Sequence, residues 1–185
     1  MKPGAGKRKG GQFERTVCKR LSEWMKADEV IFWRSASSGA RSTQLAKSGQ
    51  KAGLTGGDIT ALDEQGAWLT KYFSIECKTY ADFSFDLLLQ DKGKIPVWWE
   101  QCQLDSHRDD KKPMMIFKKN RSPIYVAFDP ISFLKISSYC TSKTINQLSF
   151  DNGRAEKSMV ILLFEDWLKQ VNFELLREII INGSI

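Results

Sequence analysis

The fold is decided by two short stretches of sequence, GGDITAL at residues 56–62 and FSIECK at residues 73–78. Both contain apolar and β-branched residues that favour strands, and both carry an acidic side chain, Asp58 in the first stretch and Glu76 in the second. The polar residues 63–66 lie between them, so we expect residues 57–62 and 72–79 to pair as strands across a turn.

The second of these strands places its polar side chains on one face. Side chains alternate along a strand, so Glu76 and Lys78 should point the same way while Ile75 and Cys77 point into the core. Carboxylates from adjacent strands can hold a hard divalent cation through oxygen ligands. A lysine beside that cation can orient or deprotonate a water for attack on phosphorus. The pattern therefore indicates metal-dependent chemistry on a phosphodiester.

Length, composition and charge fit one globular domain with an anionic partner. The 185 residues are 42% apolar and 27% charged, which allows a proper core. Residues 1–57 carry 12 Lys or Arg against 4 Asp or Glu, whereas residues 58–185 carry 16 against 18. The basic excess behind the net charge of +6 thus lies in the segment that leads to Asp58, where phosphate binding would need it.

Cysteine spacing and hydropathy predict the compartment. The four cysteines are scattered without a Cys-x-x-Cys pair, so neither a zinc site nor a disulfide framework is indicated. No apolar run approaches the ~20 residues of a membrane span, and the basic N-terminus has no apolar stretch behind it. We expect a cytoplasmic protein, or a virus-encoded one acting inside a cell, that contacts no membrane.

Apolar spacing organises the N-terminal third. Residues 1–9 should form a flexible basic arm, and apolar residues at helical spacing predict a helix over 12–26. Glu14 lies one position off the apolar stripe of this helix, where it could reach a site beside the core. A short buried strand is expected at 30–34. The Ser/Gly/Lys-rich stretch 35–57 has no apolar periodicity, which predicts a mobile loop that contacts DNA.

The rest of the chain alternates between expected helices and strands. We expect an irregular segment at 80–95, helices at 97–107, 131–134 and 173–181, strands at 114–118 and 124–128, and a strand or buried segment at 159–164. Trp98 and Trp99, at the start of the first of these helices, should anchor the core or an interface, and stacking on an opened DNA base is the alternative. The whole predicts an α/β fold, a mixed β-sheet flanked by helices, with residues 129–185 as an addition packed on the core.

At the two stretches quoted above, the chain resembles a known superfamily. Asp58, Glu76 and Lys78 match the PD-(D/E)xK nuclease signature, with Gly57 in place of the proline. The resemblance implies a restriction-endonuclease-like fold and an endonuclease that hydrolyses DNA phosphodiester bonds with Mg²⁺ or Mn²⁺.

A closer resemblance extends over roughly residues 8–128. The segments GGQFER at 10–15 and RSASSG at 34–39 precede the Asp and Glu-x-Lys strands in the order seen in archaeal-type Holliday junction resolvases. This similarity implies a homodimer that nicks two strands of a four-way junction symmetrically, because a two-fold substrate suits a two-fold enzyme.

The resemblance also implies roles for individual residues. Asp58, Glu76 and the Cys77 backbone carbonyl would ligate the metal ion, together with Glu14 directly or through water. Lys78 would orient the nucleophile or stabilise the developing negative charge. The catalytic residues are then Glu14, Asp58, Glu76 and Lys78.

Contacts to DNA are expected from two groups of residues. The first comes from the predicted loop and comprises Arg41, Lys47 and Lys51. The second corresponds to positions that the resembling family uses and comprises Arg15, Arg34, Ser35, Gln101 and Lys118.

Two other functions remain open. The long segment between Arg34 and Asp58, and residues 129–185, depart from the resolvase pattern. The chain could therefore cut other branched, flapped or duplex DNA, as a phage recombination or restriction-type enzyme does. A non-catalytic DNA-binding module on a decayed nuclease fold is the other alternative, and the intact Asp58, Glu76 and Lys78 argue against it.

Overall fold

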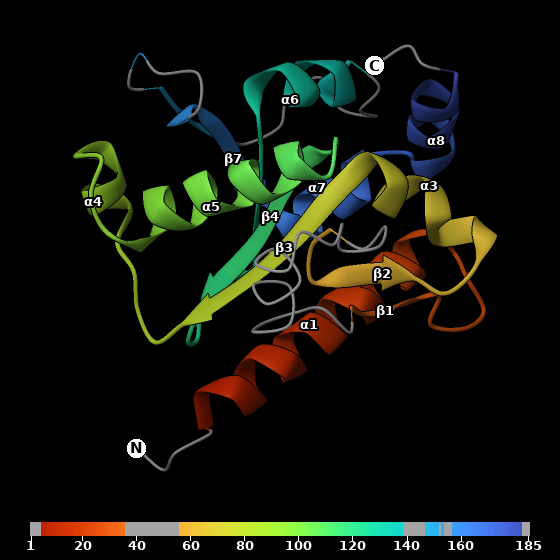
Figure 1. Cartoon of the computed structure of the whole chain (residues 1–185), viewed down its shortest axis with the longest axis horizontal. Coiled ribbons are helices and arrows are strands. Elements are labelled where there is room, and N and C mark those ends of the chain that lie inside the picture. The colour runs from red at the N-terminus through yellow and green to blue at the C-terminus, as the bar shows by residue number, and fades with distance from the viewer. Residues whose placement is uncertain (1–4, 36–55, 139–146, 152, 154–156, 183–185) are drawn as a thin grey trace.

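The main sheet has five strands, seen in a computed structural model that describes residues 5–35, 56–138, 147–151, 153 and 157–182. The strands are β3 (Phe73–Tyr80), β4 (Lys112–Lys119), β5 (Tyr125–Phe128), β6 (Gln147–Phe150) and β7 (Met159–Leu163). Their order across the sheet is β3-β4-β5-β7-β6. β3 and β4 are parallel and the other neighbours are antiparallel, so the sheet is mixed and β3 lies at its edge (Figure 1).

A second, small sheet and seven helices complete the described part of the chain. The small sheet pairs β1 (Phe32–Arg34) with β2 (Ile59–Ala61) in antiparallel fashion. The helices are α1 (Ala5–Trp24), α3 (Glu64–Tyr72), α4 (Phe85–Leu89), α5 (Lys94–Arg108), α6 (Pro130–Ser137), α7 (Phe164–Gln170) and α8 (Phe173–Ile181).

Both faces of the main sheet are covered by helices. The alternation of side chains along β4 separates two hydrophobic clusters: Met114 packs in the cluster that contains Val17 of α1, and Met115 in the cluster that contains Trp99 of α5. Figure 1 shows β3 and β4 passing between these two helices. The predicted α/β fold, a restriction-endonuclease-like mixed sheet flanked by helices, is confirmed.

The expected hairpin between 57–62 and 72–79 is wrong. β2 pairs with β1, and the stretch expected to be a turn begins α3 instead. Asp63 caps this helix, because its carboxylate accepts a hydrogen bond from the Gly66 backbone N–H at 3.2 Å. Trp68 then lies on the buried face of the helix. The capping Asp and this buried face outweighed the turn propensity of the polar residues.

The helix between the two stretches changes how they meet. Parallel pairing of two segments needs a crossover connection between them, usually a helix, and α3 supplies one here. The chain at Gly57 accordingly forms a single parallel bridge with Ile75 of β3, and Asp58 follows directly after this bridge. The two carboxylates thus come from neighbouring backbone segments, as expected, without a hairpin.

Several expected boundaries also differ. The flexible arm expected at 1–9 is wrong from Ala5 onward, because α1 begins there; Lys and Arg are good helix formers and extend a helix already anchored on the core. The irregular segment expected at 80–95 contains α4 and the start of α5. In the loop expected at 35–57, residues 36–55 lie outside the described part.

Residues 129–185 contribute to the sheet and to its core. β7 lies between β5 and β6, and the buried Trp167 of α7 packs at a ring-centroid distance of 4.9 Å from Trp24 of α1 and 5.5 Å from Phe128 of β5. Strand β6 and helix α7 were not expected from the sequence, whereas the terminal helix at 173–181 is confirmed.

Two expectations about compartment can be compared with the structure. The described cysteines, Cys18, Cys77 and Cys102, are free thiols. Among the described residues, no helix has the length and apolar character needed to cross a membrane.

Trp167→Ala should lower the free energy of unfolding by about 3–5 kcal/mol, because it removes a fully buried ring that joins α1, α7 and the sheet. Urea denaturation measures the change. Leu134→Ala, at a residue that is 66% exposed on α6, is the control and should stay within about 0.5 kcal/mol of wild type. A small effect of Trp167→Ala would show that the C-terminal part is an appendage.

Candidate active site

Asp58 is fixed to the open edge of β3 by two hydrogen bonds. Its backbone N–H donates to the Ile75 carbonyl at 2.7 Å, and its carboxylate Oδ2 accepts from the Cys77 backbone N–H at 2.9 Å. No further strand of the described chain pairs with β3 on this edge, so the carboxylate occupies a position that a ladder hydrogen bond would otherwise take.

Gly57 makes this close approach possible. Its φ is +89°, and a Cβ placed on it would lie 2.6 Å from the backbone nitrogen and oxygen of Ile75. Proline, which the superfamily signature has at this position, holds φ near −65° and cannot take this conformation. The local backbone geometry of this chain therefore favours glycine over proline at this position.

Ser35 holds the same segment from the other side. Its backbone N–H donates to the Asp58 carbonyl at 2.8 Å, and its hydroxyl donates to the Gly57 carbonyl at 2.8 Å. The side chain is buried. In this structure Ser35 positions the Asp58 backbone, while its predicted contact with DNA stays a prediction.

Glu76 and Lys78 share the face of β3 that α5 covers. Lys78 Nζ lies 3.0 Å from Glu76 Oε2 and donates a hydrogen bond to Gln101 Oε1 of α5 at 3.4 Å. Ile75 is fully buried on the opposite face, so the predicted alternation along this strand is confirmed. Asp58, Glu76, Lys78 and Gln101 thus lie together at one edge of the sheet.

The surroundings of Asp58 disfavour its ionised form. Burial and the nearby negative charge of Glu76, with a smaller effect from Glu14, raise the pKa of Asp58 from 3.8 to about 7. The hydrogen bond from Cys77 and the charge on Lys78 oppose this rise without cancelling it. Asp58 and Glu76 therefore form a pair of carboxylates whose mutual repulsion a bound cation would relieve.

Lys78 is held in its charged form. Burial lowers the pKa of Lys78, but the attraction of Glu76, their hydrogen bond and the charge on Asp58 outweigh it, so the pKa lies above its ordinary value. A protonated lysine stabilises negative charge and cannot accept a proton. Of the two tasks that the sequence suggested for Lys78, this geometry favours charge stabilisation over deprotonation of a water.

Glu14 reaches the site from the other side of the sheet. It is buried, and its Oε2 forms an ion pair with Arg34 Nε of β1. Among the described residues, no three His, Cys, Asp or Glu side chains are gathered in a way that could hold a metal ion. The predicted role of Glu14 as a metal ligand therefore stays a prediction.

The predicted DNA-contacting residues lie in several places. Arg15 is exposed on α1, Arg34 pairs with Glu14, and Lys118 Nζ lies 5.3 Å from the centre of the Phe13 ring, between β4 and α1. Arg41, Lys47 and Lys51 lie outside the described residues. Tyr80, which the sequence analysis did not single out, is the next residue after Lys78 on the same face of β3, as the period of two along a strand implies.

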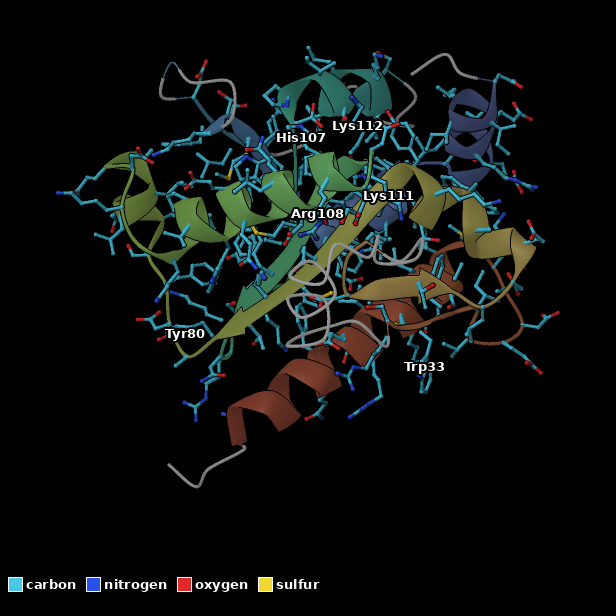
Figure 2. The ribbon with its side chains drawn as sticks, viewed as in Figure 1. Trp33, Tyr80, His107, Arg108, Lys111 and Lys112 are labelled. Atoms are coloured by element: carbon cyan, nitrogen blue, oxygen red, sulfur yellow. The ribbon has the colours of Figure 1, made fainter. Side chains whose placement is uncertain are left out.

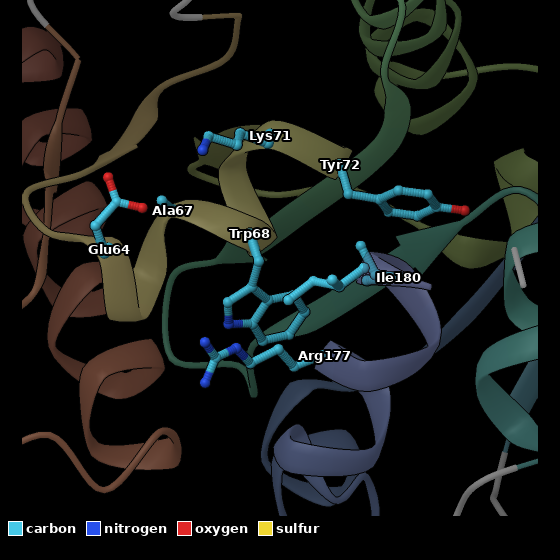
Figure 3. Close-up of a pocket in the computed structure, with 8 residues that line it drawn as sticks. Glu64, Ala67, Trp68, Lys71, Tyr72, Arg177 and Ile180 are labelled. Carbon is cyan, nitrogen blue, oxygen red and sulfur yellow. The ribbon is translucent and has the colours of Figure 1, made fainter. Parts of the chain in front are cut away.

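A cavity of about 370 Å³ lies away from these residues, between α3 and α8 (Figure 3). Its lining includes Trp68, Tyr72, Arg177 and Ile180. None of the four predicted catalytic residues lines it. The candidate active site is therefore an open edge of the sheet and not this cavity. An open edge is accessible to a large polymeric substrate.

A mixed five-stranded sheet with the Asp and Glu-x-Lys side chains at its parallel edge places this chain in the PD-(D/E)xK class of nuclease folds. The chain belongs to a family described as phage putative PDDEXK endonucleases, which matches residues 5–178. Protein D14 of Escherichia phage T5 is 30% identical over 128 residues, which are 68% of this chain and 74% of that protein. No solved structure gives a significant match.

These comparisons bear on the resemblances drawn from the sequence. Membership of the PD-(D/E)xK superfamily is confirmed and indicates a nuclease. The phage origin of the relative agrees with a virus-encoded protein. The closer resemblance to archaeal-type Holliday junction resolvases stays a prediction.

Asp58→Asn should stabilise the metal-free protein at high pH. Because the pKa of Asp58 is raised on folding, its contribution to stability is fully present below about pH 4 and is lost as the pH rises through 7. In EDTA, the free energy of unfolding of the variant relative to wild type should therefore increase by roughly 2–3 kcal/mol between pH 5 and pH 8.

Urea denaturation at a series of pH values measures this difference. Asp28→Asn, at an exposed carboxylate, is the control and should show no such trend. A constant difference between Asp58→Asn and wild type across this range would mean that Asp58 is not destabilised by its surroundings.

Proposed function

We propose that this chain is a DNA endonuclease that depends on Mg²⁺ or Mn²⁺. The observation that carries the proposal is the position of Asp58: its carboxylate is held on the Cys77 N–H at 2.9 Å, beside Glu76 and the charged Lys78. Nuclease family membership supports the same conclusion.

The residues present fit a hard divalent cation. Asp58 and Glu76 offer carboxylate oxygens, and the repulsion between them helps to raise the pKa of Asp58 to about 7. The ion would be held by these two carboxylates and the Cys77 carbonyl, with Glu14 directly or through water. Mg²⁺ commonly binds through one or two carboxylates and keeps several waters, so two carboxylates suffice.

The chain's own side chains account for the other requirements of hydrolysis. When bound, the ion would polarise the scissile phosphate and lower the pKa of a bound water. Lys78 stabilises the negative charge that develops on the phosphate, and Gln101 holds the lysine in place through their 3.4 Å hydrogen bond. The Arg34 guanidinium, oriented by Glu14, is available to a DNA phosphate beside these groups.

Within this class we propose a four-way junction as the substrate, cut by a homodimer. The order of the motifs at 10–15 and 34–39 supports this choice, and the structure brings Glu14 of the first motif into contact with Arg34 of the second. The alternatives are a nuclease for other branched or duplex DNA and a non-catalytic DNA-binding module. The charged Lys78 paired with Glu76 favours a catalytic protein over the module.

Glu76→Gln should lower DNA cleavage in Mg²⁺ or Mn²⁺ at least about 100-fold, because it removes a charged ligand without changing the shape of the side chain. Labelled four-way junction, flap, linear duplex and single strand are incubated with and without EDTA. Glu100→Gln, at an exposed glutamate of α5, is the matched control and should cleave like wild type.

The substrates distinguish the alternatives. Paired symmetric nicks confined to the junction support a resolvase and imply a dimer. Equal cutting of linear duplex retains the nuclease and rejects the resolvase. Binding of DNA without cutting of any substrate in either metal ion supports the non-catalytic module.

A further inference from the structure

Strand β3 continues past the catalytic lysine to an exposed aromatic residue. Glu76, Lys78 and Tyr80 occupy alternate positions and therefore share one face of the strand. Exposure rises along this face, from 8% at Glu76 to 49% at Tyr80. Tyr80 lies two residues, or roughly 6.6 Å along the strand, beyond Lys78. In Figure 2 it lies at the far end of β3, where the strand leaves the body of the protein.

Helix α5 runs beside this face and fixes the ring of Tyr80. Trp98 and Gln101 are one helical turn apart and point to the same side of the helix. Gln101 reaches Lys78, and the Trp98 ring meets the Tyr80 ring at a centroid distance of 6.1 Å and an angle of 65°. Phe83, which is buried, supports Trp98 from below with a further edge contact at 6.1 Å. The exposed Tyr80 ring thus packs against Trp98, which packs against Phe83.

A cation lies over the same ring. Lys94, the first residue of α5, places its Nζ 5.4 Å from the centre of the Tyr80 ring. Lys94 is exposed, and none of the ion pairs among the described residues includes it. An ammonium group on a flexible stem can leave the ring for a nearby phosphate, which frees that face of the ring.

We infer that Tyr80, Trp98 and Lys94 form a subsite for an unpaired nucleotide next to the phosphate that is cut. Tyr80 stacks on the base, Trp98 supports its ring, and Lys94 contacts the phosphate of that nucleotide. A single exposed aromatic side chain is common on protein surfaces. Here the alignment of Tyr80 with Glu76 and Lys78, and the cation above its ring, distinguish it from such a residue.

This subsite determines which DNA is bound. A base inside an intact duplex is already stacked on its neighbours and paired, so an unpaired nucleotide can stack on Tyr80 at a lower cost. The inference rests on the proposed nuclease function, and it explains a preference for DNA with unpaired nucleotides, such as flaps and single strands, over linear duplex through contacts of this chain.

Tyr80→Ala tests the subsite by binding. Fluorescence anisotropy in EDTA measures the affinity for a flap with unpaired nucleotides and for a linear duplex, without cleavage. The variant should bind the flap about 5- to 100-fold more weakly than wild type and bind the duplex equally well. Tyr80→Phe, which keeps the ring, should bind like wild type. Trp33→Ala is the matched control, because Trp33 is 50% exposed on β1, away from Tyr80 (Figure 2).

An abasic flap separates stacking from other contacts. Wild type should bind a flap with abasic positions more weakly than it binds the intact flap. Wild type and Tyr80→Ala should bind the abasic flap with equal affinity. Three results would overturn the subsite. Tyr80→Ala could lose duplex binding and flap binding equally, or it could bind the abasic flap more weakly than wild type by the same factor as the intact flap. The third result is that wild type binds no DNA. Cleavage is measured separately. Tyr80-dependent flap binding without any cleavage would retain the subsite and reject the nuclease.

Discussion

The candidate site depends on one hydrogen bond, from the backbone N–H of Cys77 to the carboxylate of Asp58. β3 is the edge strand of the sheet, and its outward N–H and C=O groups need partners. The segment around Gly57 supplies them through a single parallel bridge and the Asp58 side chain. The contacts that satisfy the hydrogen-bonding groups at the edge of the sheet therefore also bring the acidic group to the site.

The same arrangement that positions Asp58 also destabilises the ionised form of its carboxylate. Asp58 is buried near Glu76, and both effects raise its pKa to about 7, so the metal-free site carries an unfavourable concentration of negative charge. Lys78 offsets part of this charge and is itself held protonated by the two carboxylates. A strongly perturbed carboxylate that lies beside a charged lysine on a sheet edge is more typical of a functional site than of a structural ion pair. The core on both sides of the sheet holds these groups together.

The sequence predicted the placement of Glu76 and Lys78 better than it predicted the connections between strands. Alternation along 73–78 placed Glu76 and Lys78 correctly, because a period of two depends only on local strand geometry. The hairpin failed because Asp63 reads equally as a turn residue and as a helix cap, and the buried face of α3 decided between them. Glu14 pairs with Arg34, and Asp58 accepts a hydrogen bond from the Cys77 N–H. Both are tertiary contacts, which spacing along the chain does not reveal.

We propose that Asp58 and Glu76 form one divalent-cation site at the edge of β3. Anomalous diffraction from crystals grown with Mn²⁺ would locate the ion. We expect a single region of anomalous density within bonding distance of both carboxylates and the Cys77 carbonyl. Well-ordered side chains with no density there at saturating Mn²⁺, or density bound only elsewhere on the protein, would contradict it.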